Sequence, residues 1–263
     1  VVSSPHFVSA YYQNLLDVTA QWVLFENKVP RYARIASSRP AAAPAPAQTA
    51  SGGAPRWRIG WFGYLDDEKS WHILRRAAAE LKDRVSILVR GMPYNNFDME
   101  NFLRDIEALD NTVYGGPFRN PEDLARIYGA VDLVWSADCN ELDANSKWLL
   151  TNGIYEAGYF GKPVIGLART AIGEFLSQMR SGWSLAAPAE ESLIALLANL
   201  TPKQYEAKRR AILEQSETCF VETDEIEMIW TAVQNRSVRK RLARVGAEPP
   251  QATAAATFST NQR

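Results

Sequence analysis

The residues most able to do chemistry lie between Thr151 and Gly182. Asn152 and Glu156 are four positions apart in a segment with helical character, so their side chains share one face of the predicted helix. A carboxylate on such a face can accept hydrogen bonds from two neighbouring hydroxyl groups, and Asn152 could orient it. The alternative for Glu156 is a plain surface acid paired with a nearby cation, because exposed acids usually contribute little.

The sequence around this pair predicts the end of the helix and a strand after it. Gly161 is expected to end the helix, and Pro163 lies just beyond, as is common at helix C-termini. Val164–Leu167 is short and apolar, which is typical of a buried parallel strand. The helix is also rich in aromatic residues, including Trp148 and Tyr155. We interpret these rings as part of the core.

A polar loop, residues 137–147, precedes the helix. Its end, Asn145-Ser146-Lys147, is expected to combine free backbone amides, the positive end of a helix dipole and a cation, which suits a phosphate group. Plain capping by Asn145 or Ser146, with Lys147 solvated, explains the same residues equally well.

The elements that must position these residues alternate between strands and helices through residues 56–200. Strands are predicted at Trp57–Gly63, Val85–Gly91, Thr112–Gly115, Val131–Ser136 and Val164–Leu167. Helices are predicted at Glu68–Leu81, at Phe97–Leu109, from Asn120-Pro121, around Glu156 and at Ile172–Arg180. This alternation predicts an α/β, Rossmann-like fold, an open parallel sheet with helices on both faces.

Ligands of such sheets bind outside the carboxyl ends of the strands. Those ends carry Gly63, Gly91, Gly115 and Ser136 in this sequence. A glycine there lets a ligand approach the backbone, although each one could simply serve a tight turn. A shared edge with several such positions favours a pocket.

Composition excludes several classes of function. The 263 residues are 46% hydrophobic and 22% charged, with a net charge of -1, so nothing global points to nucleic acid. Two cysteines and two histidines, all far apart, give no metal-ligand spacing and favour a reducing cytoplasm. No apolar run reaches the ~18–20 residues of a spanning helix, and the N-terminus does not read as a signal peptide.

The chain divides into five predicted regions. Residues 1–36 form the first, and they begin without Met, as though inside a longer protein. Residues 37–55 are an Ala/Pro-rich linker, residues 56–200 form the α/β domain, residues 201–235 are C-terminal helices and residues 236–263 are a basic, disordered tail.

Several motifs together resemble the C-terminal, donor-binding domain of GT-B glycosyltransferases, in particular those of bacterial exopolysaccharide synthesis. They are the glutamate-bearing helix, the NPEDLARIYGAVDL run of residues 120–133 and the GKPVI strand of residues 161–165. VVSSPHF and VLFENKVP in residues 1–36 resemble the end of the N-terminal Rossmann-like domain, so the chain is expected to be a fragment that carries a remnant of that domain.

The resemblance implies roles for individual residues. Glu156 would hold the ribose of a nucleoside-diphosphate sugar, and Asn152, Ser146 and Lys147 would lie near its diphosphate. Gly63 would let the donor approach the backbone. Phe118 would face the nucleobase, although a loop aromatic packed on the core explains that residue as well. The donor is a substrate, so no cofactor and no metal is expected.

The sequence departs from the family at its catalytic residues. Many retaining members carry a second glutamate eight positions before the ribose-binding one, and this chain has Trp148 there. Asp138 or Glu141 could replace it. His6 is a candidate general base by elimination. Retaining and inverting chemistry therefore both stay open.

The implied function is transfer of a sugar from the donor to a saccharide or polyprenyl-linked acceptor in the cytoplasm. The basic cluster of residues 236–244 could rest on the inner face of an anionic membrane, although most such runs are merely solvated. Alternatives are a nucleotide-sugar epimerase of the same fold, a phospho-receiver and a non-catalytic binding module. A nicotinamide dehydrogenase is disfavoured, because Gly60-Trp61-Phe62-Gly63 does not match the G-x-G-x-x-G fingerprint.

Overall fold

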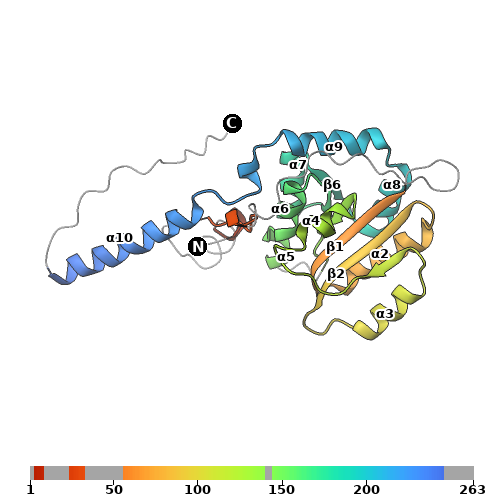
Figure 1. Cartoon of the computed structure of the whole chain (residues 1–263), viewed down its shortest axis with the longest axis horizontal. Helices are drawn as coiled ribbons and strands as arrows, with labels where there is room; N and C mark the ends of the chain where they lie inside the picture. Colours follow the sequence, from red (N-terminus) through yellow and green to blue (C-terminus); the bar gives the residue numbers. More distant parts are fainter. Residues whose placement is uncertain (1–2, 9–23, 33–55, 140–143, 246–263) are drawn as a thin grey trace. The chain divides into compact units, whose positions relative to one another are not determined.

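The computed structural model describes residues 3–8, 24–32, 56–139 and 144–245. Their main feature is a six-stranded, fully parallel sheet in the order β3-β2-β1-β4-β5-β6. Figure 1 shows its central strands β1 and β2 side by side. The strands are β1 (Trp57–Leu65), β2 (Val85–Pro93), β3 (Thr112–Tyr114), β4 (Leu133–Trp135), β5 (Val164–Leu167) and β6 (Gly182–Leu185). This is the order of the doubly wound dinucleotide-binding fold, with the switch point between β1 and β4.

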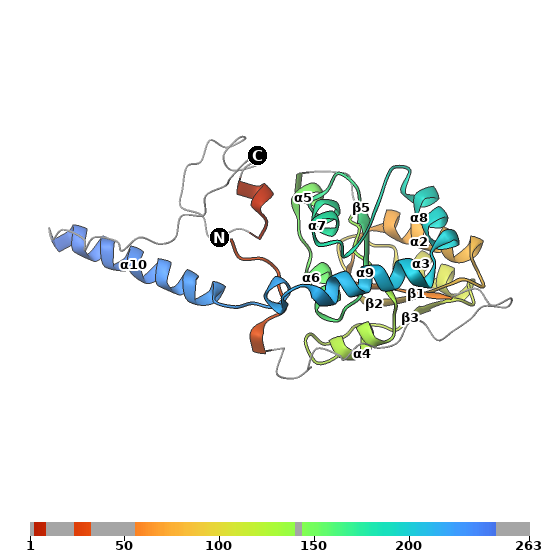
Figure 2. The same cartoon turned by 90° about the horizontal axis from the view of Figure 1, so that it is seen from above.

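Helices cover both faces of the sheet, as the alternation of elements predicted. They are α2 (Glu68–Glu80), α3 (Met99–Glu107), α4 (Leu124–Gly129), α5 (Ala144–Trp148), α6 (Asn152–Tyr159), α7 (Ala171–Met179), α8 (Ala189–Asn199) and α9 (Pro202–Glu214). One buried cluster joins the sheet to α2, α3 and α8, and a second joins it to α4, α6 and α7. Figure 2 shows α2 and α8 on one side of β1 and β2 and α4 on the other.

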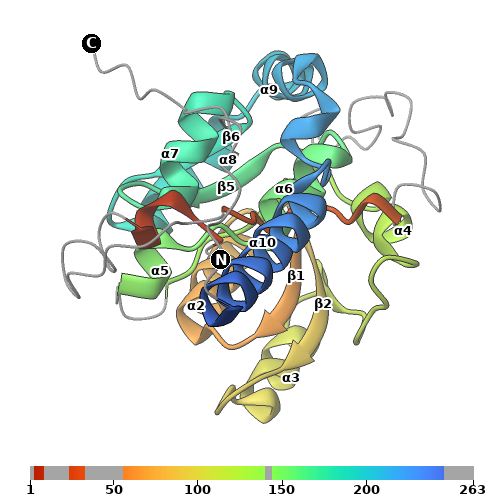
Figure 3. The same cartoon turned by 90° about the vertical axis from the view of Figure 1, so that its left-hand side faces the viewer.

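The centre of the sheet is built by β1 and β2, which pair along nine residues and lie side by side in Figure 3. Alternate residues of β1, namely Trp57, Ile59 and Trp61, are buried against the α2 face. Near the end of their pairing, two glycines lie opposite each other, Gly63 and Gly91. A Cβ atom on Gly91 would lie 1.9 Å from the Gly63 carbonyl oxygen, so only glycine permits this close approach.

Residues 24–32, from early in the chain, pack against the second buried cluster. Val29 forms a parallel bridge with Val221, next to the short 3-10 helix η2 (Glu217–Cys219). The Asn27 side-chain amide donates to the Leu150 carbonyl, and the Tyr155 hydroxyl donates to Glu26. Residues 24–32 are therefore packed onto the α/β unit, which runs to Thr223. The rest of the predicted remnant and the linker lie largely outside the described residues.

The last helix, α10 (Glu225–Val245), belongs to a separate compact unit that begins at Asp224. It continues ten residues beyond the predicted boundary at residue 235, so the basic segment is helical as far as Val245. Residues 246–263 lie outside the described residues. Across the described parts of the chain, no helix combines the length and the apolar character needed to span a membrane.

Two local predictions are wrong. Asn120-Pro121 does not begin a helix: residues 121–123 form a turn, α4 begins at Leu124, and the Asn120 side-chain amide donates to Glu156. The second error concerns residues 144–148, which form the separate helix α5, so Asn145 and Ser146 do not cap the helix of Glu156. Thr151 is the N-cap residue of α6. In addition, β6 and α8 were not predicted.

The contact between Gly91 and Gly63 gives a stability prediction. Gly91→Ala should lower the free energy of unfolding by about 1–3 kcal/mol, because overpacking against backbone cannot relax through a side-chain rotation. Gly129→Ala is the matched control: nothing lies within 4 Å of its Cβ position, and alanine should be neutral or stabilise α4 by up to about 1 kcal/mol. Urea denaturation of both variants measures the effects, and equal stabilities would contradict the tight contact.

Candidate functional site

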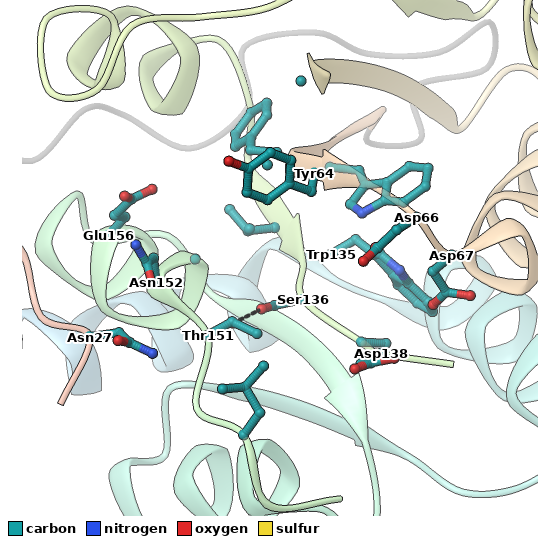
Figure 4. Close-up of a pocket in the computed structure, with 18 of the residues that line it drawn as sticks. Asn27, Tyr64, Asp66, Asp67, Trp135, Ser136, Asp138, Thr151, Asn152 and Glu156 are labelled. Atoms are coloured by element: carbon teal, nitrogen blue, oxygen red, sulfur yellow. Dashed lines mark hydrogen bonds between the residues drawn. The ribbon is translucent and has the colours of Figure 1, made fainter. Parts of the chain in front are cut away.

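A cavity of about 540 Å³ lies at the switch point of the sheet (Figure 4). Residues from the carboxyl ends of β1 and β4 line it, together with the start of α6 and the loop that contains Phe118. This is where open α/β sheets bind their ligands. Its volume suits a ligand of the size of a cofactor or a nucleotide.

Glu156 lies in the wall of this cavity and is only 6% exposed. Its carboxylate is held by two donors: the Asn120 Nδ2 atom lies 2.8 Å from Oε1, and the Tyr128 hydroxyl lies 2.8 Å from Oε2. Burial raises the pKa of Glu156, and the two hydrogen bonds partly oppose that shift. Each carboxylate oxygen accepts one of these bonds and keeps further capacity to accept from a ligand.

Two segments hold this carboxylate in place. Tyr128 comes from α4, is fully buried and packs its ring against Phe160 and Phe62. Its pKa is raised well above 10.0 by burial and by the neighbouring Glu156, so it stays a donor. Asn120 comes from the loop before α4. The site therefore depends on the packing of α6 against α4.

The N-terminus of α6 faces the same cavity. Thr151, Asn152 and Gly153 all line it. The Thr151 hydroxyl lies 2.8 Å from the Ser136 hydroxyl and makes no cap bond to the helix. Figure 4 shows this pair between β4 and α6, with Asn152 and Glu156 on the side of α6 toward the cavity. The positive end of the α6 dipole therefore points into the cavity.

The loop that carries Phe118 is held by Arg90 of β2. The Arg90 Nε atom donates to the Gly116 carbonyl over 2.8 Å, and its Nη2 atom donates to the Pro117 carbonyl. Phe118 is half-buried and contacts Phe62 edge-on, with ring centroids 6.4 Å apart. Arg90 thus positions the loop, and its guanidinium does not line the cavity.

The opposite end of the cavity is acidic. Asp66, Asp67 and Asp138 line it, and Figure 4 shows them across the cavity from Glu156. Asp67 is structural: its carboxylate accepts from the Ser70 amide and hydroxyl and from the Cys139 amide. Burial raises the pKa of Asp66, and Asp138 and Asp67 add to the shift. None of the described residues that line the cavity is Lys, Arg or His.

The structure separates the predicted site residues into two groups. One group lines a single cavity and comprises Glu156, Asn152, Gly63, Phe118 and Asp138. The cavity therefore gathers the residues expected near the ribose, the nucleobase and the carboxyl end of β1, together with one of the candidate catalytic acids.

The second group lies away from the cavity or outside the described residues. Ser146 is buried in α5, Lys147 is exposed there, and neither lines the cavity, because α5 is separated from α6. His6 also lies away from it, with its Nε2 atom 3.3 Å from the Glu174 carboxylate. Glu141 lies outside the described residues. Across the described parts of the chain, no group of three or more His, Cys, Asp or Glu residues could hold a metal ion.

Asn120 and Tyr128 are the site residues that the sequence analysis did not predict. Both lie in the 120–133 run, where the pattern around Asn120 indicates a helix cap and Tyr128 fits the apolar face of a helix. The sequence did carry one signal for Tyr128: its hydroxyl group lies on the predicted buried face of this segment. A buried hydroxyl group needs a hydrogen-bond partner, which points to a polar group nearby.

Comparison with known proteins gives one curated relative. The succinoglycan biosynthesis protein ExoL of Rhizobium meliloti (strain 1021) is 37% identical over 207 residues, which cover 78% of this chain and 50% of that protein. The chain thus spans about half the length of the curated relative that it matches. No protein-family model matches the chain.

Solved structures share the fold. A glycosyltransferase from Rickettsia africae ESF-5 is 18% identical with a TM-score of 0.56, covering 80% of this chain and 57% of that one. Anabaena Alr3699/HepE in complex with UDP-glucose is 19% identical with a TM-score of 0.54, covering 69% and 49%. At such identities these likenesses establish the fold alone. The predicted Rossmann-like GT-B fold is confirmed, and the curated relative is a protein of succinoglycan biosynthesis, in line with the predicted resemblance to proteins of exopolysaccharide synthesis.

The buried carboxylate gives a pH prediction. Because the native pKa of Glu156 is raised above its usual 4.5, the folded state binds more protons than the unfolded state, and stability falls as the pH rises from 4.5 through the native pKa. Glu156→Gln removes this titration. The stability of the wild type relative to Glu156→Gln should therefore decrease over that pH range and then level off, as measured by urea denaturation. A difference that does not change with pH would contradict the raised pKa.

Proposed function

We propose that this chain binds a nucleoside-diphosphate sugar and takes part in transferring the sugar to a saccharide or polyprenyl-linked acceptor. The transfer belongs to the synthesis of exopolysaccharide or another cell-surface glycan. One observation carries the proposal: a buried glutamate, already oriented by two donors, lines a cavity at the switch point of a GT-B-like sheet. The name of the curated relative and the UDP-glucose of the Anabaena complex support it.

In this proposal Glu156 binds the ribose. Its two oxygens accept hydrogen bonds from the neighbouring 2′- and 3′-hydroxyl groups, while Asn120 and Tyr128 hold the carboxylate in place. Phe118 lines the same cavity and faces the nucleobase. The loop that carries it is held by hydrogen bonds from Arg90.

The diphosphate binds at the N-terminus of α6. The backbone amides of Asn152 and Gly153 and the positive end of the helix dipole provide the attraction that Lys147 was expected to add. Gly63 and Gly91 leave room for the donor at the ends of β1 and β2. The protein then contributes orientation and charge stabilisation of the leaving diphosphate, and we propose no separate cofactor.

The catalytic residue stays a prediction. Asp138 lines the cavity, whereas His6 is paired with Glu174 outside it, so Asp138 is the better of the described candidates. No specific observation favours a nucleotide-sugar epimerase or a non-catalytic module, and the relative's name points to biosynthesis.

The proposed location is the cytoplasm. The basic residues 236–244 would bring the chain to the inner face of the membrane, where a lipid-linked acceptor is found. Co-sedimentation with anionic vesicles, lost at high salt, is the expected result. Equal sedimentation with neutral vesicles would contradict an electrostatic contact.

The ribose contact gives a direct test. UDP and GDP should each be titrated into the protein by calorimetry, and Glu156→Ala should weaken binding of the accepted nucleotide by about 1–3 kcal/mol, the range for lost polar pairings. Glu156→Gln keeps the side-chain volume and one oxygen acceptor. Weaker nucleotide binding by this variant would therefore reflect lost hydrogen bonds to the ribose and not a loss of folding.

Glu100→Ala is the matched control. Glu100 is an exposed glutamate of α3 whose pair with Arg104 is worth little, so its removal should leave nucleotide affinity unchanged. Failure of both nucleotides to bind the wild type, or equal affinity for wild type and Glu156→Ala, would overturn the proposed role of Glu156.

A further inference from the structure

Two exposed tyrosines form a pair at the rim of the cavity. Tyr64 lies near the end of β1 and is 62% exposed, and Tyr94 comes directly after β2 and is 52% exposed. Their ring centroids are 5.1 Å apart, with 45° between the ring planes. The Tyr94 amide donates to the Leu65 carbonyl over 3.0 Å, so the backbone on which the pair stands is fixed.

The pair leads from the cavity to the outside. Tyr64 and Met92 line the cavity, whereas Tyr94 lies just beyond its lining residues. Figure 4 shows the Tyr64 side chain over the cavity, between Glu156 on one side and Asp66 on the other. Met92 is 49% exposed and extends the same apolar surface. A ligand that stacked on Tyr64 could therefore continue outward over Tyr94.

The charges around the pair select among possible ligands. Asp66, Asp67 and Asp138 lie on one side of Tyr64, across the cavity from Glu156 (Figure 4), and none of the described lining residues is a cation. A phosphate would be repelled here, whereas a neutral ligand with many hydroxyl groups can donate hydrogen bonds to carboxylates. A pyranose ring has such hydroxyl groups. It also has a face of C–H groups that suits the negative face of an aromatic ring.

We propose that Tyr64 and Tyr94 form a platform that stacks sugar rings of the acceptor saccharide at the rim of the cavity. This inference rests on the proposed function, since it assigns the second substrate of that same site. The acceptor fits better than the donor's own sugar, because both tyrosines are more than half exposed and Tyr94 lies outside the residues that line the cavity.

The test uses the 263-residue chain and neutral oligosaccharides that end in glucose, galactose or mannose, titrated by saturation-transfer NMR with UDP present. At least one of them should bind. Tyr64→Ala and Tyr94→Ala should each weaken saccharide binding at least about fivefold more than UDP binding. Tyr64→Phe keeps the ring and should stay within about twofold of the wild type. Tyr32→Ala, at another exposed tyrosine, should change nothing.

Several results would overturn the platform. It is rejected if no saccharide binds, or if neither alanine variant weakens saccharide binding. It is also rejected as an acceptor site if the alanine variants weaken binding of UDP-glucose but not of UDP, because the platform would then hold the donor sugar. Absence of UDP binding in the wild type, with saccharide binding intact and dependent on the tyrosines, would instead reject the proposed function and keep the platform.

Discussion

The site depends on one buried carboxylate whose oxygen atoms must have hydrogen-bond donors. A charged or polar group as buried as Glu156 is costly without partners, so its two donors are a condition for placing it at that depth. Those donors come from α4 and from the loop before it, while Glu156 itself belongs to α6. The hydrogen bonds therefore couple segments that are far apart in sequence, and they fix the wall of the cavity before any ligand arrives.

Local sequence patterns predicted much of the fold but less of this coupling. The strand at Val164–Leu167 and the helix that carries Glu156 follow from periodicity and from the glycine at its end. The role of Asn120 could not be predicted in the same way. Its position before a proline and an acid matches a helix cap, and only the tertiary fold brings it within 2.8 Å of Glu156. The break between α5 and α6 is equally hard to predict, because the bond between Ser136 and Thr151 that accompanies it is a tertiary contact.

The two ends of the cavity differ in their electrostatic character. The start of α6 supplies a positive end without any side-chain cation among the described lining residues, and the far end carries carboxylates. Backbone amides and the helix dipole can hold an anion at one fixed place, and the carboxylates at the far end repel it. The separation of these two ends gives a ligand with a charged part and a neutral part only one favourable orientation.

The close approach of Gly63 and Gly91 links the fold to the rim of this cavity. Because Gly91 has no side chain to meet the Gly63 carbonyl, β1 and β2 stay paired to their very ends, as far as Leu65 and Pro93. Gly63 itself has a φ of 127°, which side chains rarely tolerate. The next residue after β2, Tyr94, then bonds to Leu65 and brings its ring to within 5.1 Å of Tyr64. A side chain at Gly91 would push the strands apart, and one at Gly63 would strain the backbone, so either change would move the two rings. The backbone constraint in the sheet and the aromatic surface at the cavity are thus consequences of the same two glycines.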